Sequence, residues 1–201
     1  MPPQFNFAKS DNVKSVAISW PAPQRIEDSE GVTIGYKTGV VFPLKIEPED
    51  ASKPVVLRLK LDYAICEKLC VPAEGKSELS IKTGGSGGAA IAAADKTIPQ
   101  PLAFGADAAL SLKGVHQDDD GKRVLIDIAA PAGAKLAIFA EGPAPDWALP
   151  VPQKIDGAPA GQQRFAFALD GMPPGVSAKG ATLRITAVAG DKAIETTFRL
   201  D

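Results

Sequence analysis

Hydrophobic and polar residues alternate over much of the first third of the chain, which is typical of β-strands that bury one face. The clearest alternation spans residues 55–63. Its inward-facing positions are expected to be Val55, Leu57, Leu59, Leu61 and Tyr63. A return strand with the same period is expected over residues 77–82. Shorter strands are expected over residues 13–20, 32–36 and 40–46, the last of them at a sheet edge or a bulge because it contains Pro43.

The second half of the chain shows the same short, strand-like runs, separated by Gly, Pro and Asp in turn positions. The predicted strands cover residues 109–115, 123–128, 135–140, 164–169, 182–188 and 193–200. No helix alternates with these strands, so a doubly wound sheet is not expected. Strands of this length and spacing favour a β-sandwich.

A Gly-rich stretch at residues 84–88 separates the two halves and has the composition of a flexible linker. The Ala-rich residues 89–96 that follow it predict a short helix. We therefore expect an all-β protein with a first domain over residues 1–83, the linker and helix over 84–104, and a second domain over 105–201.

Composition and charge narrow the function classes. The chain has 201 residues and a net charge of −2, with no stripe of basic residues of the kind that binds nucleic acid. No run of 18 or more apolar residues predicts a transmembrane helix. The first five residues lack the basic and apolar parts of a signal peptide.

The most informative chemistry is a pair of cysteines, Cys66 and Cys70, which are the only two in the chain. They lie in the connection between the strands 55–63 and 77–82, at one end of the predicted sheet, where a loop or a single tight turn suits a bridge. A disulfide that closes so small a loop stabilises the fold by only about 2 kcal/mol. The spacing therefore favours a bond that opens and closes.

Three other interpretations of the cysteines stay open at this point. They could form a structural disulfide in a non-catalytic binding or adaptor module, or remain two buried free thiols. A zinc site needs four ligands, and the chain offers only His116 besides the two sulfurs, so it would require carboxylates or a second chain.

Five neighbouring residues could modulate the pair. Lys68 lies between the cysteines and could lower a thiol pKa, whereas Glu67 and Glu74 could raise it or carry a proton. Tyr63 and Tyr36 could shield the sulfurs. Each of the five could equally be a packing residue or a solvated surface residue.

The sequence around the cysteines, residues 63–74, resembles the signature of the periplasmic N-terminal domain of DsbD/ScsB-type thiol:disulfide interchange proteins. Looser similarity to the same family covers nearly the whole chain, at residues 3–7, 10–13, 20–23, 35–36, 140–143, 146–150 and 182–200. Members usually carry a signal peptide and further N-terminal strands before the segment that begins here, so the resemblance implies a start that is truncated.

The resemblance implies two immunoglobulin-like β-sandwich domains in series and a periplasmic location. It implies a component of a protein-disulfide reductase, in which Cys66 and Cys70 relay electrons from a membrane-embedded thiol reductase to oxidised periplasmic thioredoxin-like proteins. No cofactor is expected, because the dithiol itself carries two electrons. By the same resemblance, Cys70 is the sulfur that forms mixed disulfides with partners.

Overall fold

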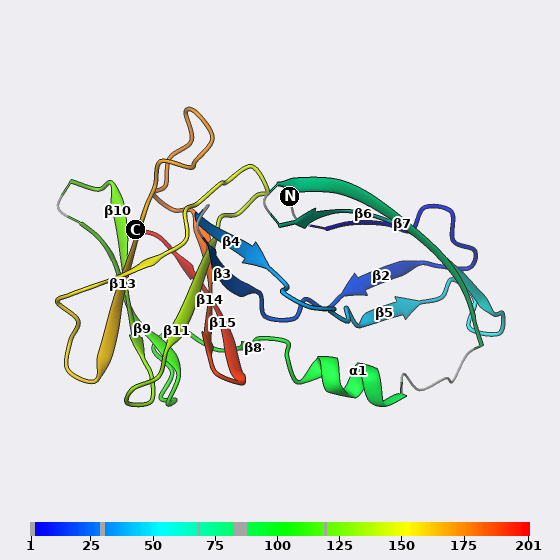
Figure 1. Ribbon diagram of the computed structural model, residues 1–201, viewed down its shortest axis with the longest axis horizontal. Helices are drawn as coiled ribbons and strands as arrows, with labels where there is room; N and C mark the ends of the chain where they lie inside the picture. Colours follow the sequence, from blue (N-terminus) through cyan, green and yellow to red (C-terminus); the bar gives the residue numbers. More distant parts are fainter. Residues whose placement is uncertain (1–2, 29–30, 68, 83–87, 119) are drawn as a thin grey trace. The chain divides into compact units, whose positions relative to one another are not determined.

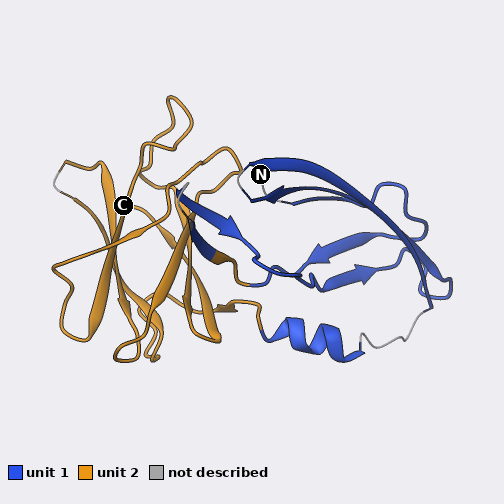
Figure 2. Ribbon diagram, viewed as in Figure 1, with its two compact units in different colours: residues 1–21, 25–96 blue, residues 22–24, 97–201 orange. Residues whose placement is uncertain are grey.

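The chain folds into β-strands with one short helix, as the expected fold class requires (Figure 1). The computed structural model describes residues 3–28, 31–67, 69–82, 88–118 and 120–201. Two compact units divide it: unit 1 comprises residues 1–21 and 25–96, and unit 2 comprises residues 22–24 and 97–201 (Figure 2). Residues 84–87 of the expected linker lie outside the described residues.

Unit 1 is built from three small antiparallel sheets and the helix α1 (Gly88–Asp95). Its strands are β1 (Gln4–Asn6), β2 (Ser15–Ile18), β3 (Gln24–Asp28), β4 (Gly31–Gly35), β5 (Leu44–Glu47), β6 (Val55–Cys66) and β7 (Cys70–Ile81). The sheets have the orders β1-β6-β7, β2-β5 and β3-β4. β5 begins directly after Pro43, whose carbonyl accepts a hydrogen bond from Ser19 N at 2.9 Å.

The hairpin of β6 and β7 dominates unit 1, and its two strands have 12 residues each. The predicted alternation is present in β6, but burial fades along the strand. Val55 and Leu57 are 4% and 7% exposed, whereas Ile65 near the other end is 60% exposed. The hairpin is therefore anchored at its base and exposed at its tip. The return strand is longer than expected, because it begins at Cys70 rather than near Ser77.

An aromatic cluster of Phe5, Trp20, Tyr36 and Phe42 packs by edge-to-face contacts, with ring centroids 5.2–5.6 Å apart. Phe5 is the Cα partner of Leu61 across β1 and β6, so its side chain shares the apolar face of the hairpin. The cluster thus contributes Phe5 to that face.

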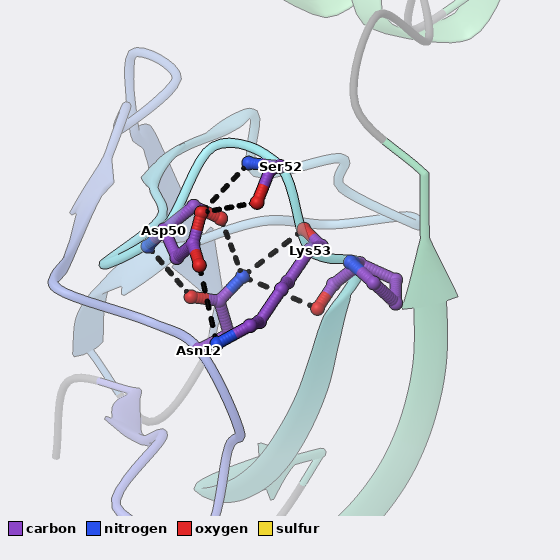
Figure 3. Close-up of polar contacts among 5 residues, drawn as sticks. Asn12, Asp50, Ser52 and Lys53 are labelled. Atoms are coloured by element: carbon purple, nitrogen blue, oxygen red, sulfur yellow. Dashed lines mark hydrogen bonds and ion pairs between the residues drawn. The ribbon is translucent and has the colours of Figure 1, made fainter.

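The base of the hairpin is fixed by Asn12 (Figure 3). Its side-chain amide donates to the carbonyls of Asp50, Lys53 and Pro54 at 2.9–3.3 Å, and its Oδ1 accepts from Asp50 N at 2.8 Å. Asp50 in turn accepts from the Ser52 hydroxyl at 2.6 Å. Asn12 holds a φ of 58°, a left-handed conformation that asparagine tolerates better than most residues. The network ties the turn before β6 to the segment that follows β1.

Unit 2 is a sandwich of two four-stranded sheets, with orders β12-β13-β10-β9 and β11-β14-β15-β8. Its strands are β8 (Gln100–Pro101), β9 (Ser111–Gln117), β10 (Arg123–Ala129), β11 (Leu136–Glu141), β12 (Gln153–Ile155), β13 (Gln162–Ala168), β14 (Thr182–Ala189) and β15 (Lys192–Arg199). Val124, Ile126, Ile128 and Leu183 are fully buried between the sheets. Six of these strands lie within a few residues of their predicted positions.

Trp147 closes one part of this core. Its side chain is 9% exposed, and it lies against Gly142, where a Cβ atom would collide with the indole. Gly142 is thus required by the close approach of the ring.

Candidate functional site

Cys66 and Cys70 form a disulfide that joins the last residue of β6 to the first residue of β7. The two residues are direct Cα partners in the ladder, with their Cα atoms 4.0 Å apart. The cysteines therefore belong to the strands, and Glu67 N donates to Leu69 O at 3.4 Å between them. The connection between the two strands is shorter than the sequence indicated.

The backbone hydrogen bonds of β6 show whether Cys66 and Cys70 form a hydrogen-bonded or a non-hydrogen-bonded pair of the ladder. Asp11 N donates to Val56 O at 2.9 Å, and Val56 N donates to Asp11 O at 3.2 Å. Val56 thus turns its backbone groups away from β7. The register has no shift from Val55 to Cys66, so every even-numbered residue of β6 does the same. Cys66 and Cys70 form a non-hydrogen-bonded pair, the class in which opposed side chains lie closest.

Pro72 fits the same register. It lies opposite Ala64, two residues from the disulfide, at another non-hydrogen-bonded position. Its missing N–H would have pointed away from β6, so proline removes no hydrogen bond from the hairpin. A proline in the strand that carries Cys70 is therefore compatible with a continuous ladder.

The strand alternation decides which side chains share a face with the sulfurs. Going from the tip towards the base, the face of the disulfide carries Ala64 and Pro72, then Asp62 and Glu74, then Lys60 and Lys76. The opposite face carries Ile65 and Val71, then Tyr63 and Ala73. The sulfurs therefore lie on the polar face of the hairpin.

Charged residues on this face are paired with one another. Lys60 Nζ lies 3.0 Å from Asp62 and 3.1 Å from Glu74, and Lys76 Nζ lies 2.7 Å from Glu74. Hydrogen bonds from Lys76 and then Lys60 hold the pKa of the Glu74 carboxyl below its usual value. A carboxyl kept ionised in this way is a poor proton carrier near neutral pH.

The disulfide is open to solvent. Both cysteines and Glu67 are exposed, and the neighbouring Ile65, Leu69 and Val71 are 60%, 80% and 59% exposed. Exposed apolar side chains beside a reactive bond are typical of a surface that contacts other proteins. The interpretation as two buried free thiols is wrong, because the sulfurs are bonded to each other and exposed.

The two tyrosines lie apart from the face of the sulfurs. Tyr63 points to the opposite face of the hairpin, and Tyr36 belongs to the aromatic cluster. The Tyr36 hydroxyl donates to Pro21 O at 2.8 Å, and burial raises its pKa to about 12. This placement gives neither residue a shielding position over the sulfurs. Lys68 lies outside the described residues.

Sequence reasoning missed the residues that anchor the hairpin. Arg58 donates from Nη1 to Asp11 at 2.9 Å and from Nε to Glu78 at 2.7 Å, while Ser10 Oγ accepts from Arg58 N at 2.9 Å. The contacts of Arg58 with Ser10 and Asp11 join residues 48 and 47 positions apart, and no local pattern signals them. No group of three or more potential metal ligands occurs among the described residues. Nor does any helix in the described part of the chain have the length and apolarity to span a membrane.

Comparisons with known proteins agree with this geometry. Residues 1–82 match the family model for the N-terminal domain of the thiol:disulfide interchange protein DsbD. The whole chain superimposes on 77% of the crystal structure of the N-terminal periplasmic domain of ScsB from Proteus mirabilis, with a TM-score of 0.67 and 16% sequence identity. No curated protein sequence matches the chain. The resemblance drawn from the cysteine segment is confirmed.

Proposed function

Because residues 1–82 match the family model of DsbD N-terminal domains, we propose that this chain is a periplasmic module that relays two electrons through Cys66 and Cys70. One observation carries the proposal: the only disulfide of the chain is exposed at the tip of a hairpin whose base is firmly anchored. A protein partner can reach such a bond without any unfolding of the core.

The relay has two steps, each of which conserves electrons. A thiolate of the electron donor attacks one sulfur of the Cys66–Cys70 bond, and the other cysteine leaves as a thiolate that takes a proton from water. A second donor thiolate then resolves the mixed disulfide, so the donor is oxidised and the pair is reduced. The reverse sequence passes the two electrons to an oxidised acceptor.

The partners we propose are a membrane-embedded thiol reductase as donor and oxidised periplasmic thioredoxin-like proteins as acceptors. This part of the proposal rests on the family and on the apolar residues Ile65, Leu69 and Val71 beside the bond. Unit 2 contains no cysteine and would orient or stabilise the module.

The reduction potential of the Cys66–Cys70 pair tests the proposal. A structural disulfide lies below about −300 mV, whereas a relay requires a higher value, which equilibration with glutathione or dithiothreitol buffers measures. The Cys66→Ala variant should capture an oxidised thioredoxin-like protein as a mixed disulfide on Cys70. Ser80→Ala, an exposed change on β7 that keeps both sulfurs and every proposed modulator, is the control. A potential below −300 mV without mixed disulfides would favour the adaptor with a structural bridge.

A further inference from the structure

We infer that the free edge of β7 pairs with an extended, cysteine-bearing segment of the partner protein, and that this strand addition directs the attack to Cys70. The inference deepens the proposed function, on which it rests. It names how the partner is held and which sulfur it reaches. The argument uses the sheet order, the register and the direction of the disulfide.

Among the strands of the described residues, none pairs with the outer edge of β7. In the order β1-β6-β7, the strand β7 lies at the edge over its full 12 residues. The even-numbered residues of β7 turn their backbone groups away from β6, as the Asp11–Val56 bridge and the unbroken register require. The free N–H groups belong to Cys70, Glu74, Lys76, Glu78 and Ser80, and none of them has a hydrogen-bond partner among the described residues.

The direction of the disulfide makes this edge the reactive one. Cys66 lies on the inner strand and Cys70 on the edge strand, so the S–S bond runs across the hairpin towards the free edge. Displacement at Cys70 Sγ requires a thiolate that approaches from the side opposite Cys66. A strand added beyond β7, about 4.8 Å away, presents its side chains from that side. A cysteine of the added strand opposite Cys70 shares the face of both sulfurs.

Side chains along the edge restrict which segments fit. Beyond Cys70, the even positions carry Pro72, then Glu74, Lys76 and Glu78, all exposed. Edge charges of alternating sign and a proline discourage indiscriminate pairing of strands. They are compatible with an antiparallel segment that places cationic, anionic and cationic residues opposite those three charges. The occupant is thus an extended partner segment with its cysteine opposite Cys70.

The exchange conserves atoms and electrons. The partner thiolate forms a bond with Cys70 Sγ, the Cys66–Cys70 bond breaks, and Cys66 leaves as a thiolate that takes a proton from water. In the opposite direction, the Cys70 thiolate attacks a disulfide sulfur of a segment held on the same edge. Either direction uses the same alignment of the strand.

A synthetic peptide tests the alignment directly. The probe is the nine-residue peptide Lys-Val-Glu-Val-Lys-Val-Thr-Val-Cys. Its C-terminal cysteine is joined to thionitrobenzoate by a disulfide. Full-length Cys66→Ser protein in reduced form attacks the peptide sulfur, and the release of yellow thionitrobenzoate gives the rate. We expect this rate to exceed that of glutathione–thionitrobenzoate, at equal concentration, by about tenfold. N-methylation of the polar residues of the peptide should abolish the advantage, and N-methylation of its valines should preserve it.

Two pairs of variants locate the effect. Glu74→Pro removes an N–H group that faces the free edge and breaks no hydrogen bond between β6 and β7. It should bring the rate with the peptide down to the rate with glutathione–thionitrobenzoate. Glu74→Ala keeps this N–H group and should keep the faster rate with the peptide. Cys70→Ser leaves the Cys66 thiol on the inner strand, and it should show no peptide advantage. Circular dichroism verifies the fold of each variant.

The outcomes separate this inference from the proposed function. If glutathione exchanges with the wild-type disulfide but the peptide reacts no faster, or if Glu74→Pro equals Glu74→Ala, strand addition is wrong and the relay stands. If the disulfide resists both thiols, the relay fails and strand addition fails with it. Sedimentation that shows a dimer sensitive to Glu74→Pro, without a peptide advantage, would assign the edge to a second copy of the chain and overturn the inference.

Discussion

Asp127 and Arg164 are direct cross-strand partners in unit 2, and their side chains form a two-point ion pair. Arg164 Nε lies 2.6 Å from Asp127 Oδ1, and Nη2 lies 2.7 Å from Oδ2. The Asp127 side chain is 6% exposed and borders Gly114 on β9, where the ladder shifts register after Asp127. The pair joins the two middle strands of this sheet at a point where a charge is shielded from water.

Asp127→Ala should lower the melting temperature of unit 2 by several degrees, because it leaves the Arg164 guanidinium without its paired acceptor. Asp146→Ala, which removes an exposed carboxylate, is the matched control and should have little effect. Thermal unfolding followed by circular dichroism measures both. The Arg164→Met change combined with Asp127→Ala should recover part of the loss, and an additive double variant would contradict the coupling.

Gly142→Ala should lower the free energy of unfolding by about 1–3 kcal/mol, because the added methyl collides with the buried Trp147 side chain. Gly39→Ala introduces the same methyl where nothing lies within 4 Å, so it is the control. Chemical denaturation followed by tryptophan fluorescence reports the change at Trp147. Equal stability of the two variants would refute the close packing.

Asn12 offers a test of the anchor at the base of the hairpin. Asn12→Ala loses the hydrogen bonds to the turn at residues 50–54 and also forces alanine into a left-handed conformation. We expect a loss of about 2 kcal/mol in the free energy of unfolding. Asn12→Gly loses the same hydrogen bonds without the conformational cost, and it should lose only about 1 kcal/mol. Urea denaturation measures the difference, and a glycine variant no more stable than the alanine variant would be inconsistent with the left-handed backbone.

Reduction of the Cys66–Cys70 bond should leave unit 1 folded and lower its free energy of unfolding by about 2 kcal/mol, because the bond closes only a five-residue loop. Urea denaturation with and without a phosphine reductant measures the change. Unit 2 has no cysteine and is the internal control. Unfolding of unit 1 upon reduction alone would favour a structural bridge.

The Tyr36 hydroxyl should ionise only at strongly alkaline pH, because burial raises its pKa to about 12 from an unfolded value near 10. The neutral form is the one favoured in the folded state. Its contribution to stability is therefore complete below pH 10 and is lost as the pH rises from 10 to 12. Absorbance at 295 nm, compared between the wild type and Tyr36→Phe, follows the ionisation. A difference spectrum that titrates near pH 10 would contradict the burial of this hydroxyl.

Much of the fold was predictable because local alternation specifies strands. The run at residues 55–63 located most of β6, and the cysteine segment resembled the family whose model matches residues 1–82. The face of the hairpin on which the sulfurs lie was not predicted, because the sequence placed the cysteines in a connection outside the strands. In the structure the strands continue to Cys66 and Cys70, so the alternation of faces includes the disulfide. That extension separates Tyr63 from the bond, although the two are close in sequence.

The free edge of β7 was equally invisible in the sequence. The edge follows from the sheet order, and the N–H groups that face it follow from the pairing of Asp11 with Val56. That contact joins residues 45 positions apart, and short-range patterns carry no information on such contacts. The division into a first domain over residues 1–83, a linker and helix over 84–104 and a second domain over 105–201 stays a prediction. The main boundary between the two compact units lies between residues 96 and 97.

The position of Cys66 directly across the ladder from Cys70 has a consequence for the lifetime of the complexes that the proposed relay would form. When an incoming thiol displaces Cys66, the released sulfur stays directly across the ladder from Cys70. Its local concentration is then far above that of any protein in solution, so recapture of Cys70 competes with every productive step. In the proposed relay, complexes with a partner would therefore be short-lived, each ending when the partner's second thiol or the returning Cys66 breaks the mixed disulfide.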